Sequence, residues 1–127
     1  MNKSIKTLDK FTVKRKTWDR GKEYSFLYNS ETKKKCVMGF LGIRLGMKLE
    51  DLAEVMYLEG NKLLRVPKLT WNIMRDIAKV NDQSIKDPDD LKLDNYEKPV
   101  KIKSESAREL WLTRLFKKAG IEVEFVD

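Results

Sequence analysis

The first part of the chain alternates polar and apolar positions in two short stretches, a pattern typical of half-buried β-strands. Residues 11–16 alternate briefly and predict a first strand. Residues 23–28 predict a second strand, and because successive side chains point to opposite faces, its aromatic residues share one face. These aromatic residues are Tyr24, Phe26 and Tyr28. Turn-forming residues then favour a β-hairpin over about 23–37, with a basic return strand.

The middle of the chain predicts helices. Residues 36–46 are strongly apolar with three glycines and fit either a buried helix or a buried strand, so we interpret them as core. Residues 49–56 carry apolar side chains at helical spacing and predict a short helix. A further helix is expected to open at Pro67 and to run to about Val80, because proline is favoured in the first helical turn.

The C-terminal pattern predicts a helix followed by a strand. Ser106 and Glu109 have the spacing of a capping box, and Gly120 supplies a helix stop. Between them lies an apolar stripe formed by Leu112, Leu115, Phe116 and Ala119. Residues 121–126 then alternate, which predicts a strand.

Together these elements predict an α+β fold. We expect a small antiparallel sheet, built from the N-terminal hairpin and the C-terminal strand, packed with three or four helices. The length suits a single domain over 1–127. Residues 83–103 contain Pro88, Pro99 and four aspartates, and predict a long loop that is either functional or mobile.

Composition excludes several chemistries. The chain has no histidine and one cysteine, Cys36, so it holds no Ser–His or Cys–His nucleophile pair and no Cys/His zinc site. We therefore predict no catalytic residue, no metal site and no cofactor, and interpret Cys36 as a small buried hydrophobe. A lone cysteine fits a reducing compartment, and no apolar run reaches about 18 residues, so we expect a cytoplasmic protein without a membrane span.

The net charge of +7 is unevenly placed along the chain. Residues 1–50 hold 13 basic against 5 acidic side chains, whereas residues 51–127 hold 14 against 15. A cationic region of this kind is typical of a surface that binds phosphates or an acidic protein. Charge runs alone favour a solvated face that keeps the protein soluble, whereas the uneven placement of the charge favours a binding surface. The residues predicted to bind a macromolecule are Lys14, Arg15, Lys16, Trp18, Arg20, Lys33, Lys34 and Lys35.

Aromatic residues beside lysines also raise the possibility of binding to single-stranded nucleic acid. In such domains bases stack on rings while lysines contact phosphates, and Trp18 and Tyr24 are the stacking candidates here. A half-buried strand that covers the core explains the aromatic face as well, and we favour that interpretation.

Several short motifs follow one another along the chain. They are Arg20-Gly21, the stretch from Cys36 to Gly39, Gly46, Asn81-Asp82 after a helix, and a helix–Gly–strand ending from Phe116 to Val126. In this order they resemble a group of small phage and prophage proteins of unknown function, marked by a Cys-Cys-Leu-Gly stretch after a short hairpin. Val37 stands in place of the second cysteine, so no redox or metal role transfers.

The resemblance implies a phage or prophage origin and action inside a bacterial host cell. With no catalytic constellation in the sequence, we predict a non-catalytic accessory protein that binds a host macromolecule stoichiometrically, a class that includes inhibitors of bacterial defence systems. The expected partner is a host protein or a protein–nucleic-acid complex. Direct nucleic-acid binding through the basic N-terminal region is the alternative, and an enzyme that uses carboxylates, lysine or metal-bound water is the third hypothesis.

Overall fold

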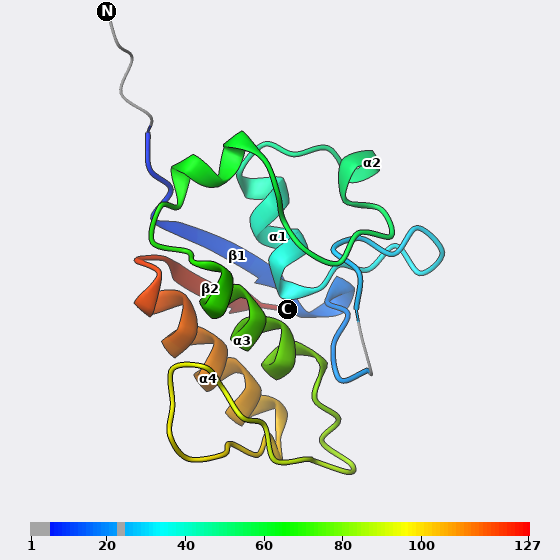
Figure 1. Cartoon of the computed structure of the whole chain (residues 1–127). Helices are drawn as coiled ribbons and strands as arrows, with labels where there is room; N and C mark the ends of the chain where they lie inside the picture. The colour runs from blue at the N-terminus through cyan, green and yellow to red at the C-terminus, as the bar shows by residue number, and fades with distance from the viewer. Residues whose placement is uncertain (1–5, 23–24) are drawn as a thin grey trace, which may run out of the picture.

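The computed structural model of this chain describes residues 6–22 and 25–127, and over these residues it contains four α-helices, two short 3₁₀ helices and two β-strands. In chain order the elements are β1 (Lys10–Lys14), η1 (Arg15–Thr17), α1 (Val37–Arg44), α2 (Leu49–Leu52), η2 (Asn61–Arg65), α3 (Trp71–Asp82), α4 (Glu105–Lys118) and β2 (Glu122–Val126). Figure 1 shows the strand pair behind α3, with α1 beside β1 and α4 beside β2. The prediction of a mixed α and β fold with up to four helices is confirmed.

The two strands run parallel, with Lys10 opposite Glu122 and Lys14 opposite Val126. The predicted antiparallel sheet is therefore wrong. The strands come from opposite ends of the described chain, and the helices between them bring the chain back to the end of the sheet at which β1 begins. Strands joined by a long crossover can pair in parallel, whereas a tight hairpin would have made antiparallel neighbours.

β1 has one buried and one exposed face. Phe11 and Val13 point into the core, where the ring of Phe11 meets the ring of Phe116 in α4 edge to face, with centroids 5.0 Å apart. This packing holds α4 across the strand pair. The intervening residues of β1 are exposed: Lys10, Thr12 and Lys14.

The strand predicted over 23–28 does not form in its described residues. Leu27 is buried, whereas Phe26 and Tyr28 are only partly buried, so the expected aromatic face is not the one that covers the core. Tyr24, which was expected on the same face, lies outside the described residues.

The hairpin predicted over 23–37 is reduced to a tight turn. The backbone N–H of Leu27 donates to the carbonyl of Val55 at 2.7 Å, so this segment binds the chain that follows α2. Farther on, the N–H of Asn29 donates to the carbonyl of Lys34 at 2.8 Å across the turn. The basic return stretch therefore follows a turn but joins no sheet among the described residues.

The glycine-rich stretch 36–46, for which helix and strand were both open, forms helix α1. Gly39 permits its close packing, because a Cβ atom at this position would lie 1.8 Å from the carbonyl oxygen of Leu27. Gly46 follows the helix with φ +95°, a conformation that L-residues rarely adopt, and so ends it as expected.

The two following helices differ from prediction in length. The helix expected over 49–56 ends at Leu52. The next begins after Pro67, because Thr70 provides a side-chain cap: its Oγ1 accepts a hydrogen bond from the N–H of Ile73 at 3.3 Å. A capping hydroxyl satisfies an N–H group at the helix start, which proline cannot do with its own side chain.

The C-terminal helix and strand are confirmed, but the predicted cap is wrong. The cap is Ser104, whose Oγ accepts from the N–H of Ala107 at 3.0 Å, and Ser106 lies within the first turn. Glu109 accepts hydrogen bonds from Arg15, which is distant in the sequence, and does not close a capping box. Gly120 follows the helix with φ +74°. The whole predicted apolar stripe is buried: Leu112, Leu115, Phe116 and Ala119.

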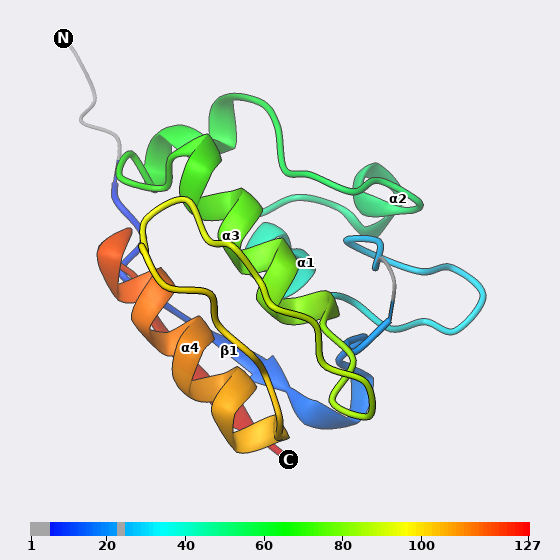
Figure 2. The same cartoon turned by 60° about the horizontal axis from the view of Figure 1, so that its bottom comes forward.

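Residues 83–103 form a loop without helix or strand, as predicted. Figure 2 shows this loop, in yellow, running in front of α3 and α4. Leu91 and Val100 exchange two backbone hydrogen bonds of 2.8 and 2.9 Å across it. The fully buried carboxylate of Asp76 in α3 accepts a bond from the N–H of Asp94 at 2.8 Å and so holds the loop against the helix. Its mobility remains a prediction.

Candidate binding groove

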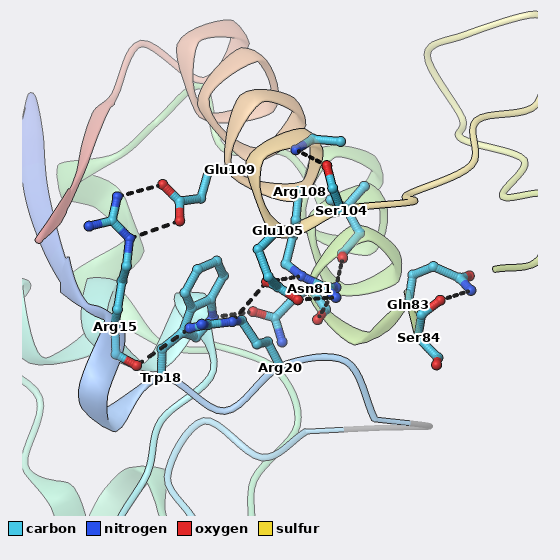
Figure 3. Close-up of polar contacts among 12 residues, drawn as sticks. Arg15, Trp18, Arg20, Asn81, Gln83, Ser84, Ser104, Glu105, Arg108 and Glu109 are labelled. Carbon is cyan, nitrogen blue, oxygen red and sulfur yellow. Dashed lines mark hydrogen bonds and ion pairs between the residues drawn. The ribbon is translucent and has the colours of Figure 1, made fainter. Parts of the chain in front are cut away.

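The predicted binding residues fall into two groups, and the first group is used inside the molecule. Arg15 binds Glu109 through two parallel bonds, Nε to Oε2 at 2.9 Å and Nη2 to Oε1 at 2.8 Å (Figure 3). Its Nη1 also binds Oδ1 of Asp127 at 3.0 Å. These bonds raise the pKa of Arg15 above its ordinary value. A guanidinium held in this way joins η1 to α4 and the end of β2, and two carboxylates oppose its charge.

Trp18 and Arg20 also have internal partners. The Trp18 side chain is only 3% exposed, and its Nε1 donates to Oδ1 of Asn81 at 2.8 Å. Its ring packs against Phe125 and lies 4.2 Å below the guanidinium of Arg20, whose Nε contacts Glu105 at 2.8 Å. A ring enclosed in this way offers no open face to a nucleic-acid base.

The centre of this internal network is Arg108, which the sequence analysis missed. Arg108 is fully buried, and its Nη1 donates to the carbonyls of Val80 and Asn81 at 2.7 and 2.9 Å. Its Nε and Nη2 bind Glu105 at 2.9 and 3.1 Å. Burial opposes the ionisation of Glu105, but the hydrogen bonds and charges of Arg108 and Arg20 outweigh it, so the pKa of Glu105 is lowered. The network thus joins the end of α3 to the start of α4.

The second group comprises the five predicted lysines. Lys16, Lys33 and Lys34 are exposed in η1 and in the tight turn, and Lys33 has φ +61°. Lys14 and Lys35 lie together on another part of the surface, where Lys14 contributes to lowering the pKa of Lys35. Lysines that are close together in the sequence therefore lie at two different places on the surface of the fold.

Lys14 and Lys35 line a groove of about 520 Å³ between β1 and the C-terminal half of α1. Lys10 and Arg44 line it as well, and among the described residues no carboxylate does so. None of these four cations forms an ion pair within the part of the chain that the structure describes. The other lining residues are Phe11, Thr12, Thr17, Phe40 and Ile43. We call this feature the β1–α1 groove.

Lys35 shows how crowded the positive charge is. Its Nζ lies 4.9 Å from the ring centroid of Phe40 and 5.8 Å from that of Tyr28. Partial burial, and then the charge of Lys14, lower the pKa of Lys35 from its ordinary value. An anion in the groove would relieve the repulsion between the two lysines, because an opposite charge nearby favours the protonated form.

The charge changes sign across the strand pair. The register places Glu122 opposite Lys10 and Glu124 opposite Thr12, and all four side chains are exposed. The acidic side therefore belongs to β2, whereas the groove lies on the opposite side of β1, toward α1. An acidic ligand would be attracted to one side of the sheet only.

Other chemistry has little support in the described residues. No group of three or more His, Cys, Asp or Glu side chains among them could hold a metal ion. Cys36 is buried, as expected, and burial raises the pKa of its thiol to about 12. No helix within 6–22 and 25–127 has the length and apolar character needed to cross a membrane.

Comparisons of this chain with protein-family models, with curated proteins and with solved structures found no match.

Proposed function

We propose that this chain is a non-catalytic binding protein and that the β1–α1 groove holds an acidic segment of a partner protein. The observation that carries the proposal is the convergence of Lys10, Lys14, Lys35 and Arg44 on one groove without a carboxylate among its described lining residues. Collecting like charges in one place is unfavourable unless a ligand compensates them. An acidic ligand that enters the groove would provide this compensation.

Two features favour a protein over a nucleic acid. The only tryptophan among the predicted binding residues, Trp18, is enclosed, so base stacking on it would require the fold to open. The groove instead offers Phe40 and the partly exposed Ile43, which suit aliphatic side chains placed between acidic ones. Phosphates would satisfy the cations as well, so nucleic acid remains the second candidate.

The resemblance to small phage and prophage proteins supports a host macromolecule as the partner and the bacterial cytoplasm as the place of action. A stoichiometric binder of this type would block or redirect a host factor, with bacterial defence systems as one class of target. The positive field of the groove would speed the encounter with an acidic surface.

A direct binding measurement tests the proposal. A fluorescent peptide of alternating glutamate and leucine, and single-stranded and duplex DNA of matched charge, are titrated with the protein by anisotropy. We expect the peptide to bind more tightly than either DNA at the same ionic strength. The double variant Lys14→Glu/Arg44→Glu is expected to lose at least roughly tenfold in peptide affinity, or about 1.4 kcal/mol.

The control variant is Lys86→Glu/Lys98→Glu, which changes the net charge equally at exposed positions in the loop over 83–103. We expect it to bind the peptide nearly as the unmodified protein does. An equal loss in both variants would show that net charge, not the groove, governs binding. Tighter binding of DNA would move the proposal to the nucleic-acid alternative.

A further inference from the structure

The outer edge of β1 carries backbone groups that the sheet does not use. The N–H of Glu122 donates to the carbonyl of Asp9 at 2.8 Å, which fixes the phase of the parallel ladder. Backbone groups of successive residues in a strand point to alternate sides, so those of Phe11 and Val13 face β2. Those of Lys10 and Thr12 consequently face away from β2, toward the side on which the groove lies.

At Lys10 and Thr12 the described residues provide no backbone partner for this edge, whereas just before β1 it is covered by another segment. The N–H of Leu8 donates to the carbonyl of Arg65 at 2.8 Å, and Nε of Arg65 donates to the carbonyl of Lys6 at 3.2 Å, so η2 occupies the edge there. Among the described residues, no hydrogen bond outside the strand ladder involves the backbone of Lys10 or Thr12. The five residues of β1 span roughly 16 Å, a usual length for a paired strand.

We propose that the acidic partner segment binds as an extended strand added to this edge of β1. Its backbone would exchange hydrogen bonds with Lys10 and Thr12, and its acidic side chains would reach Lys14, Lys35 and Arg44 in the groove. This inference rests on the proposed function and specifies how the ligand is held: backbone bonds give affinity, and the cations select acidic side chains.

Charge decides between an acidic partner and a second copy of this chain. Pairing two β1 edges would bring the lysines at 10 and 14 of one copy close to those of the other, and like charges on neighbouring strands are destabilising. Lysines on an edge strand are a common protection against such self-pairing. The same lysines attract a strand that carries glutamate or aspartate, so they exclude one occupant and recruit another.

Proline at position 12 provides a selective test. Thr12→Pro removes the one N–H that this residue directs to the open edge and leaves the ladder bonds of Phe11 and Val13 to β2 in place, since proline is tolerated on edge strands. Thr12→Val keeps the N–H and is the matched control. The probe is the glutamate–leucine peptide, used unmodified and with alternate backbone amides N-methylated.

We expect Thr12→Pro to weaken peptide binding by roughly tenfold, Thr12→Val to leave it nearly unchanged, and the N-methylated peptide to bind the unmodified protein about tenfold more weakly. Bound peptide should slow amide hydrogen exchange at Thr12, while exchange at Phe11 stays constant. The methylated-peptide and exchange measurements use the unmodified protein, so they remain decisive even if Thr12→Pro folds poorly.

Equal binding of methylated and unmethylated peptide, with no slowing at Thr12, would overturn strand addition. If Lys14→Glu/Arg44→Glu still weakened binding in that case, charge recognition in the groove would stand alone. Slow exchange at Thr12 that depends on protein concentration without peptide would assign the edge to a second copy and overturn the inference.

Discussion

Replacing Asn81 with alanine should remove a large part of the free energy of unfolding, because one buried amide joins three segments of the chain. Its Oδ1 accepts from Nε1 of Trp18 at 2.8 Å and from the N–H of Val37 at 3.1 Å. Its Nδ2 donates to the carbonyl of Asp19 at 3.1 Å. Val37 is the first residue of α1, whose own cap residue provides no side-chain bond, so Asn81 caps that helix from α3.

The size of this loss in the free energy of unfolding follows from the buried polar groups that would lose their hydrogen-bond partner. Asn81→Ala leaves two buried N–H groups and one carbonyl without their partner, at about 1–3 kcal/mol each, and partial relaxation brings the expected total to about 3–6 kcal/mol. Domains of this size are stable by about 5–15 kcal/mol. The variant should therefore unfold at a much lower urea concentration or fail to fold at all.

Urea unfolding followed by tryptophan fluorescence and circular dichroism measures the effect. The control is Asn72→Ala, an exposed position on the same helix, α3. Subtracting the two changes removes the gain in helix propensity that alanine brings in both. The m-value should stay similar, because both variants expose the same surface on unfolding. A difference between the two variants below about 1 kcal/mol would refute the assignment of Asn81 as the joint between these segments.

Three further outcomes are expected. Gly39→Ala should destabilise the fold by at least about 2 kcal/mol in the same urea assay, because its Cβ would lie 1.8 Å from the carbonyl oxygen of Leu27; a neutral effect would contradict the tight packing of α1. Burial raises the pKa of Asp82 to about 6 from 3.8, so the folded state binds more protons than the unfolded state in that window. Stability should then fall as pH rises from about 4 to 6, and Asp82→Asn should remove this fall; identical pH profiles would count against it. The Cys36 thiol should react with a disulfide reagent at neutral pH only as fast as the chain opens, so a rapid reaction with the folded protein would contradict its burial.

Local pattern was sufficient wherever neighbours in the sequence decide the structure. The apolar stripe of the last helix, the stop at Gly120 and the strand after it depend on contacts within a few residues and on side-chain periodicity. The cap shows the limit of this reasoning. Ser104 and Ser106 both have a side chain that can cap a helix. The spacing of Glu109 from Ser106 favoured Ser106, but Glu109 pairs with Arg15 and the cap is Ser104.

Contacts between distant segments could not be read in the same way. Nothing in the alternation over 11–16 indicates that these residues pair with the last strand, or in which direction. An arginine in a predicted helix, such as Arg108, is normally expected to be exposed. Only the approach of two carbonyls from α3 explains its complete burial. Buried polar groups depend on such partners, and the partners are set by the tertiary fold.

The sequence identified only some of the cations that line the groove, because the tertiary fold decides which of them lie together. Charge runs identified Lys14 and Lys35, but a run of basic residues does not place its members on one face. Arg44 comes from α1, and only the packing of this helix beside β1 brings its charge near the two lysines. Arg15 and Arg20 belong to the same sequence region, yet carboxylates of α4 bind both.

The pairing of β1 with β2 has a consequence during synthesis. A ribosome delivers residues 10–14 long before residues 122–126, so β1 must wait for a neighbour that is made much later. Until then, the apolar side chains of Phe11 and Val13 lack their final cover, and both lateral edges of the strand are unpaired. Closing so long a span of chain is slow compared with forming the helices. The nascent polypeptide is therefore expected to be prone to aggregation and to depend on chaperones until β2 emerges.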